Sequence, residues 1–398
     1  MARTPISRRS FMQAGAGLPL ALSIDPSDGM AIPGTLPSSQ EPQRLQSVVK
    51  LSGDGPSMTP PEFTHFLATV VSEGGVEPDY YSNGGVVEAL ERKMAEILGK
   101  ERAVFLPTGT LANHLAVRVQ ARGRSRVIVQ KESHLYNDSG DCAQILSSLN
   151  LVPLAESGGT FTLEEVEEVI GRAEGGRVTT GVGVISIESP IRRLLGKLFD
   201  YEEMKRICAF SRSRGIATHL DGARLFMASG YTGISPAEYA SHFDTVYVSM
   251  WKYLNAPSGA ILAGPAALLD DLFHTRRMFG GGLPYAWPFA AAALASVDGF
   301  AERFARGIEA GEALKTALNA IPGLRVEEIP DGSNLFKLRV DRGDPEALRS
   351  ALRERGILLG APNPNFRGFA IAVNETLTRL PVEEISGAFS DSLGSPAR

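Results

Sequence analysis

The most informative stretch of this chain reads Ile216-Ala217-Thr218-His219-Leu220-Asp221-Gly222-Ala223-Arg224. Its apolar start predicts a buried strand, and the strand ends on an acid, a glycine and an arginine. A second apolar run, Thr245-Val246-Tyr247-Val248-Ser249, continues through Met250 and Trp251 to Lys252. Asp221 and Lys252 lie 31 positions apart (252 − 221). Neighbouring strands would bring both ends to one edge of a sheet.

At such an edge the two segments offer three functional groups. Asp221 can pair with a pyridinium nitrogen, Arg224 can hold a carboxylate through two parallel hydrogen bonds, and Lys252 can bond to an aldehyde. These are the groups that a pyridoxal phosphate (PLP) enzyme needs from its protein. Taken singly, an acid or a lysine after a strand is more often a solvated turn residue. Their order, spacing and surroundings together favour the cofactor site.

Short apolar runs alternate with amphipathic helices from about Val86 onward. Continuous apolar strands separated by helices indicate a mostly parallel sheet that is covered on both faces. Ligands of such open sheets bind at the carboxyl ends of the strands, where the candidate residues fall. The runs are 103–106, 126–129, 182–187, 216–220, 245–249 and 259–263.

The pattern changes after a long helical stretch from Phe289 to about Ile321. Predicted strands over 334–340 and 369–373 then alternate with helices over 345–355 and 382–393. A chain of 398 residues is also too long for one ordinary core. We therefore predict a large α/β domain over 49–295 and a smaller α+β domain over 296–398.

Two further motifs could hold the cofactor. Thr108-Gly109-Thr110 leads into a helix, where backbone N–H groups, two hydroxyls and the helix dipole suit a phosphate. The same tripeptide is also an ordinary helix N-cap. His134, within Glu132-Ser133-His134-Leu135-Tyr136, could stack on the pyridine ring or be a hydrogen-bonded structural residue.

These motifs together resemble the threonine aldolase/β-eliminating lyase family of fold-type I PLP enzymes. The resemblance runs from about Ser52 to Leu393 and implies an aspartate aminotransferase-like large domain with a seven-stranded, mostly parallel sheet. The matching segments are Pro107-Thr108-Gly109-Thr110-Leu111-Ala112-Asn113, His134, His219 to Leu225, Ser249 to Lys252, and Gly280-Gly281-Gly282.

The resemblance also assigns roles to residues and an assembly. It implies Lys252 as the lysine that bonds PLP, Asp221 on the ring nitrogen, and Arg224 near the substrate carboxylate. Thr108, Gly109 and Thr110 would hold the phosphate. Members are usually homodimers or homotetramers, which makes Asp79-Tyr80-Tyr81 a candidate to reach a neighbouring subunit.

The chain departs from the family pattern where substrate is bound. Ile191, in Glu188-Ser189-Pro190-Ile191, stands where the family has a histidine near the β-hydroxyl. Ala370 stands in place of a second arginine for the substrate carboxylate, and Arg367 is a candidate substitute. Ser52, in Ser52-Gly53-Asp54, is a candidate carboxylate contact. Trp251 replaces a residue that is usually small or polar.

The resemblance implies a lyase that cleaves a β-hydroxy-L-amino acid to glycine and an aldehyde. That reaction needs a base for the β-hydroxyl proton, for which His134 or a water is the candidate. β-Elimination to ammonia and a keto acid is the alternative, followed by aminotransferase or racemase activity. A PLP-fold binding protein with little catalysis is a further alternative, against which the intact Asp221, Arg224 and Lys252 argue.

The N-terminus differs from the rest of the chain. Ser7-Arg8-Arg9-Ser10-Phe11-Met12 is a twin-arginine pattern before a short apolar stretch, far too short to span a bilayer. We predict a Tat-type signal over 1–31 and a flexible leader over 32–48, with a disordered basic N-terminus as the alternative. The protein is then periplasmic or otherwise exported, or cytoplasmic if the signal is not used.

The charge and the cysteines limit the partners. With a net charge of −5 and no basic block after the N-terminus, nucleic acid and membrane surfaces are poor partner candidates for the mature form. Two cysteines, Cys142 and Cys208, show no metal-ligand spacing. The expected ligands are PLP and an amino acid, without a metal.

Overall fold

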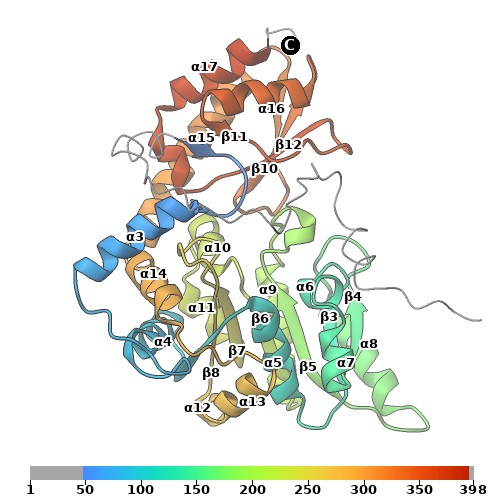
Figure 1. Ribbon diagram of the computed structural model, residues 1–398. Coiled ribbons are helices and arrows are strands. Elements are labelled where there is room, and N and C mark those ends of the chain that lie inside the picture. Colours follow the sequence, from blue (N-terminus) through green and yellow to red (C-terminus); the bar gives the residue numbers. More distant parts are fainter. Residues whose placement is uncertain (1–47, 394–398) are drawn as a thin grey trace, which may run out of the picture. The chain divides into compact units, whose positions relative to one another are not determined.

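The computed structural model describes residues 48–393. Its largest sheet has seven strands (Figure 1). The strand order is β2-β8-β7-β6-β5-β3-β4. Every neighbouring pair is parallel except the two that involve β8, so the predicted mostly parallel sheet is confirmed. The strands are β2 (Arg102–Leu106), β3 (Arg126–Gln130), β4 (Asn150–Leu154), β5 (Val182–Glu188), β6 (Ala217–Asp221), β7 (Thr245–Ser249) and β8 (Ala260–Gly264).

Helices cover both faces of this sheet because successive strand residues point to opposite sides. Val104 and Leu106 of β2 pack in one core cluster with Leu115 of α5 (Gly109–Ala121). Phe105, between them, packs in the cluster on the other face with Leu90 of α4 (Gly85–Leu98). This two-sided burial explains why the strands read as continuous apolar runs.

The remaining helices that surround or follow this sheet agree with the expected alternation. They are α3 (Pro60–Ser72), α6 (His134–Asn137), α7 (Cys142–Ser147), α8 (Leu163–Glu174), η1 (Arg192–Leu194), α9 (Tyr201–Ser213), α10 (Leu225–Thr232), α11 (Pro236–Ser241), α12 (Ala266–Leu269), α13 (Leu272–Met278) and α14 (Trp287–Val297).

A second core lies around a three-stranded antiparallel sheet, ordered β12-β10-β9. Val49 and Leu51, at the start of the described chain, also pack in this core, and β1 (Val49–Lys50) pairs with β11 (Ile357–Leu358). The division of domains at 295/296 stays a prediction. The other elements are α15 (Phe300–Asn319), β9 (Leu324–Glu327), β10 (Leu335–Val340), α16 (Pro345–Glu354), β12 (Gly368–Ala372), η2 (Glu375–Arg379) and α17 (Val382–Leu393).

Strand β9 and the short strands β1 and β11 were not expected from the sequence, and two further differences have a clear physical reason. The helical stretch predicted from Phe289 to Ile321 is two helices, α14 and α15, which are interrupted at Gly299 with φ +68°. A backbone in that region favours glycine, and the extended Asp298 just before it ends α14. Strand β4 was not predicted because Pro153 interrupts its apolar run; β4 is an edge strand, where a proline is tolerated.

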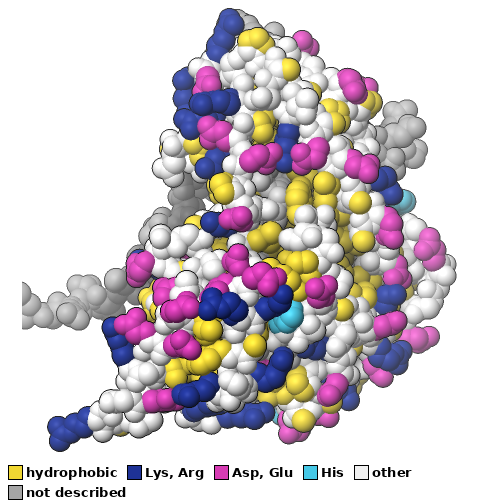
Figure 2. Space-filling view, turned by 180° about the vertical axis from the view of Figure 1, so that it is seen from behind, with side chains coloured by type: hydrophobic (Ala, Val, Ile, Leu, Met, Phe, Trp, Pro, Cys, Tyr) yellow, Lys and Arg dark blue, Asp and Glu magenta, His cyan; other side chains and the backbone are white. Residues whose placement is uncertain are grey.

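Acidic and basic side chains intermingle over the face shown in Figure 2. Within residues 48–393, no helix has the length and apolar character needed to cross a membrane. The predicted signal over 1–31 and nearly all of the predicted leader over 32–48 lie outside the described residues.

Candidate active site

Strands β6 and β7 lie side by side, and Asp221 faces Tyr247 across them. Lys252 follows β7 by three residues, so the acid and the lysine reach the same edge of the sheet, as the sequence predicts. Burial, and next the charge of Arg224, lower the pKa of Lys252 to about 8. Roughly a tenth of this amine is therefore unprotonated at pH 7, far more than for an ordinary lysine, and the unprotonated form is the one that attacks an aldehyde.

The Asp221 carboxylate is buried, with 3% of its surface exposed. Its Oδ2 accepts a hydrogen bond of 2.5 Å from Asn113 Nδ2, and its Oδ1 accepts one of 3.2 Å from the Ala223 N–H. No described lysine or arginine forms an ion pair with it. Lys252 and Arg224 act on this carboxylate electrostatically, but neither forms a direct ion pair with it, so the site fits a ligand that brings a positive charge into contact with Asp221.

The phosphate loop lies beside this pair at the start of α5. Thr108 is the N-cap, and its Oγ1 accepts the Leu111 N–H at 3.2 Å, so this hydroxyl serves the helix. A Cβ on Gly109 would come within 1.9 Å of the Tyr247 hydroxyl oxygen, so only glycine fits there. The open helix N-terminus and the Thr110 hydroxyl form a cradle that is suited to an anion.

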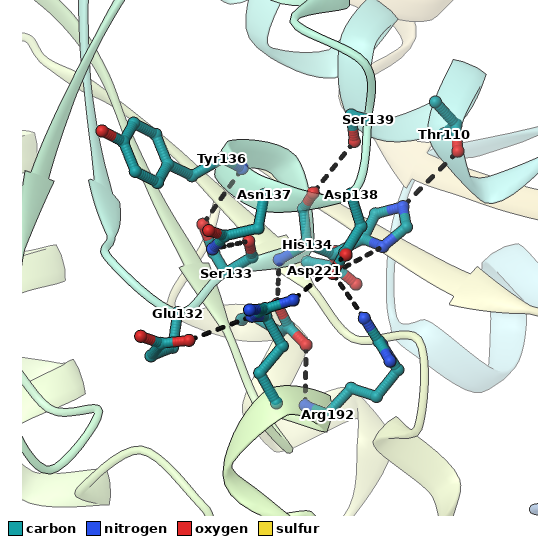
Figure 3. A network of polar contacts seen from close by, with 12 residues as sticks. Thr110, Glu132, Ser133, His134, Tyr136, Asn137, Asp138, Ser139, Arg192 and Asp221 are labelled. Atoms are coloured by element: carbon teal, nitrogen blue, oxygen red, sulfur yellow. Dashed lines mark hydrogen bonds and ion pairs between the residues drawn. The ribbon is translucent and has the colours of Figure 1, made fainter. Parts of the chain in front are cut away.

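His134 begins α6 and points toward this cradle (Figure 3). Its Nε2 lies 3.4 Å from Thr110 Oγ1, and its Nδ1 lies 3.9 Å from a carboxylate oxygen of Asp138. Burial is the largest influence on the ring and lowers the pKa of His134. The imidazole is therefore neutral at physiological pH and can accept a proton.

Glu188 is a site residue that was not predicted. It ends β5 as the neighbour of Asp221 on β6, and it is 3% exposed. Its two carboxylate oxygens accept the backbone N–H groups of His134 at 2.5 Å and Arg192 at 2.9 Å. Burial, and then the charge of Asp221, raise the pKa of Glu188 to about 7. An acid at the end of a buried strand was the only signal in the sequence.

Arg224 is held in place by a second residue that was not assigned a role, Asp54. The Nε of Arg224 lies 2.8 Å from Asp54 Oδ1, and the side chains are only 11% and 13% exposed. Neither terminal nitrogen of Arg224 donates to another described residue. The guanidinium is therefore fixed by Asp54 while its two terminal nitrogens stay free to bind a carboxylate.

The other predicted substrate contacts are placed differently. Ser52 is half-buried two residues before Asp54. Arg367 is exposed, and its Nη2 donates to the Gly343 carbonyl oxygen at 2.7 Å rather than to a residue of the site. The roles of both stay predictions. Arg192 and Arg193, which follow Ile191, both bind Asp138 at the rim near His134.

Comparison with known proteins identifies the family. Residues 71–339, more than half of the chain, match the model of the beta-eliminating lyase family. The chain belongs to this family. Its relatives include the low-specificity L-threonine aldolase 1 of Arabidopsis thaliana, 26% identical over 83% of this chain and 93% of that protein. The low specificity L-threonine aldolase of Escherichia coli K12 is 28% identical over 72% of this chain and 84% of that protein.

Solved structures agree with this placement. A protein of Listeria monocytogenes, assigned as an L-allo-threonine aldolase, has a TM-score of 0.72 and 27% identity, over 88% of this chain and 98% of that one. A serine palmitoyltransferase of Sphingomonas wittichii shares the fold alone, with a TM-score of 0.63, 16% identity and 87% coverage of each chain. The predicted fold type, family and enzyme class, a PLP-dependent carbon–carbon lyase, are confirmed.

The residues of this beta-eliminating lyase fit PLP. Lys252 offers an amine of lowered pKa for the aldehyde, Asp221 a buried carboxylate for the ring nitrogen, and the loop at Gly109 an anion cradle for the phosphate. When bound, PLP supplies an electron sink for a carbanion at the substrate α-carbon. His134 lies between the phosphate loop and Glu188, where a stacking residue is expected.

Proposed function

We propose that this enzyme cleaves a β-hydroxy-L-amino acid to glycine and an aldehyde, in the manner of a threonine aldolase. The observation that carries the proposal is the convergence of Lys252, Asp221 and Arg224 at one edge of the sheet, with the Asp221 carboxylate buried and in no direct ion pair with a described residue. The names of the relatives support the same reaction.

Each side chain has a role that its surroundings allow. Arg224, fixed by Asp54, binds the substrate carboxylate and so orients the bonds at the α-carbon. His134, neutral because it is buried, accepts the β-hydroxyl proton as the carbon–carbon bond breaks. Such general-base catalysis is worth about 10²–10⁴-fold in rate. Glu188 holds His134 through its backbone N–H and thereby fixes the base.

β-Elimination is the second candidate, and Ile191 is the observation that favours it. This side chain is completely buried and apolar, so position 191 provides no acceptor for a β-hydroxyl proton. Loss of a β-substituent as ammonia and a keto acid form does not require that acceptor. The two reactions differ in their products, which makes them simple to distinguish.

A visible spectrum of wild type and Lys252→Ala tests the cofactor and the lysine together. We expect an absorbance band of lysine-bound PLP in wild type and its loss in the variant. Threonine, allo-threonine and phenylserine are then added to the wild type. Glycine supports the aldolase, and ammonia with a keto acid supports elimination. A reconstituted wild type without the band contradicts the assignment of the site.

We further infer that the enzyme is a homodimer or homotetramer. Two aromatic side chains, Tyr80 and Tyr285, are 68% and 60% exposed. Both lie in segments that Asp79 joins, because its carboxylate accepts the N–H groups of Ser82 and Ala286 at 2.8 Å. Large, rigidly held aromatic residues are typical of subunit interfaces. Light scattering after gel filtration measures the assembly, and Tyr80→Ser with Tyr285→Ser should weaken it.

We also propose export by the Tat route, on the basis of the twin-arginine pattern at residues 7–12, which lies outside the described residues. Export of the folded protein would carry PLP with it. Expression with Arg8→Lys and Arg9→Lys should retain the protein in the cytoplasm, whereas unchanged fractionation of this variant would contradict the proposal.

A further inference from the structure

Four buried polar side chains form a line behind Asp221. They come from one helix and two strands: Asn113 and Gln120 from α5, His219 from β6, and Thr245 from β7. Asn113 and Gln120 are two helical turns apart and share one face of α5. His219 and Thr245 face each other across β6 and β7. All four are at most 2% exposed.

Each member contacts the next by a hydrogen bond. Asn113 Nδ2 donates to Asp221 Oδ2 at 2.5 Å, and Asn113 Oδ1 lies 2.9 Å from His219 Nε2. His219 Nδ1 lies 2.8 Å from Thr245 Oγ1. Gln120 Nε2 donates to the same Thr245 oxygen at 2.6 Å. The line of four thus connects, without a gap, to the carboxylate that faces the cofactor site.

The chemistry of the groups fixes the direction of each bond, starting at Asp221. Asn113 presents its NH₂ group to the Asp221 carboxylate, with Nδ2 donating to Oδ2. The amide oxygen of Asn113 then faces His219 and requires a donor. His219 Nε2 therefore carries a proton.

The directions of the remaining hydrogen bonds follow from the neutral state of the His219 ring. Burial lowers the pKa of His219 to about 4, and a neutral imidazole has a single N–H. Because Nε2 holds that proton, Nδ1 accepts the hydroxyl proton of Thr245. The Thr245 oxygen in turn accepts from Gln120, whose Nε2 also donates to the Ala116 carbonyl oxygen at 3.1 Å. That second bond prevents the Gln120 amide from being reversed, although its Oε1 is left buried without a partner.

We propose that Asn113, His219, Thr245 and Gln120 are positioning residues that keep the Asp221 carboxylate oriented toward the ring nitrogen of the cofactor. All four bonds point the same way, so each polarises the next and strengthens the final, charge-assisted bond. The inference rests on the proposed function only in that Asp221 binds the cofactor ring. It predicts an effect on kcat rather than on KM, since none of the four contacts the substrate carboxylate site at Arg224.

The protonation of His219 tests the direction of the bonds without any cofactor. The chain has six histidines, and His219 is assigned in ¹⁵N NMR spectra by the signal that His219→Gln removes. At neutral pH the wild-type apoprotein and holoenzyme should both show a neutral ring with its proton on Nε2. A proton on Nδ1, or a doubly protonated ring, would overturn the inference.

Matched substitutions test the effect on the cofactor. Thr245→Val removes the hydroxyl with little change of shape, and Thr245→Ser retains it. Thr218→Val makes the same change next to His219 but outside the line, since the Thr218 hydroxyl binds Asp244. We expect Thr245→Val, which removes the hydroxyl that contacts both His219 and Gln120, to change the His219 signal and the visible spectrum of the holoenzyme. It should lower kcat about fivefold to tenfold at unchanged KM, because only the break next to His219 is transmitted to Asp221.

Thr245→Ser should recover the wild-type signal, and Thr218→Val should keep it. Identical effects of Thr245→Val and Thr218→Val, or no effect of Thr245→Val on signal and spectrum, would overturn the inference. If Thr245→Val does not fold, the tautomer of His219 in the wild type and in Thr245→Ser still tests the direction of the bonds. A wild type with the expected tautomer but without glycine formation would contradict the proposed function and leave the positioning line intact.

Discussion

Replacing Gly109 by alanine should damage the cofactor site through a single added methyl group. The new Cβ would lie 1.9 Å from the Tyr247 hydroxyl oxygen and 2.4 Å from its ring carbon Cζ. Carbon atoms do not approach side chains closer than 3.0 Å, so the loop or the ring must move by at least 1.1 Å (3.0 − 1.9). Tyr247 is 2% exposed and cannot swing into solvent, so the loop is the part that yields.

The cost of this overpacking is about 1–3 kcal/mol in the free energy of unfolding. A displaced helix N-terminus also loses a charge-assisted hydrogen bond to the phosphate, which corresponds to a PLP affinity about tenfold to a hundredfold weaker. The apoprotein is followed by thermal unfolding, and PLP is titrated by the visible absorbance that appears on binding.

Gly171→Ala is the matched control, because it adds the same methyl group within α8 where no atom lies within 4 Å. Alanine is the better helix former, so this variant should gain about 0.5–1 kcal/mol and bind PLP as wild type does. The double variant Gly109→Ala/Tyr247→Phe should recover part of the lost stability and PLP affinity, because it removes the hydroxyl oxygen that the new Cβ meets first. The recovery should be incomplete, because the ring carbon Cζ still crowds the methyl group. A Gly109→Ala protein with wild-type stability and PLP affinity would refute the close packing and the phosphate cradle.

The remaining predictions concern the charged groups of the site. Asp54→Asn should loosen Arg224 and raise KM about tenfold with a smaller change in kcat, measured by steady-state kinetics on phenylserine. Glu188→Gln should displace His134 and lower kcat about tenfold to a hundredfold. Because the folded-state pKa of Glu188 is raised from 4.5 to about 7, wild-type apoprotein should lose stability relative to this variant as pH rises through that window, which denaturant unfolding at several pH values measures. PLP uptake by the apoprotein should accelerate up to about pH 8, where Lys252 loses its proton, and then level off; a rate independent of pH would contradict the lowered pKa.

Much of the fold was predictable because the strands of the large sheet are buried on both faces. Their apolar runs are continuous, so Asp221 at the end of β6 and Lys252 just beyond β7 stand out against that background. The sequence did not predict β4, because Pro153 interrupts its apolar run. The structure tolerates this proline because β4 lies at the sheet edge, where a missing backbone N–H costs little free energy. The sequence did not predict the break between α14 and α15 because only two residues make it: Asp298, which is extended and ends α14, and Gly299, which precedes α15.

The residues around the cofactor site were harder to find than those within it. Asn113 binds Asp221 from 108 positions away, and Asp54 binds Arg224 from 170 positions away. Neither contact leaves a local pattern, because a buried amide or carboxylate is specified by its partner and not by its neighbours in sequence. In the sequence, Glu188 belongs to a segment that departs from the family pattern, and only the strand register places it beside Asp221.

The most direct test of the central claim is the stoichiometry of the products formed from phenylserine by the holoenzyme. With Lys252, Asp221 and Arg224 serving a retro-aldol cleavage, we expect glycine and benzaldehyde in equal amounts, no ammonia, and no product from Lys252→Ala. Ammonia with a keto acid in place of glycine, or equal product from the Lys252→Ala variant, would contradict the account.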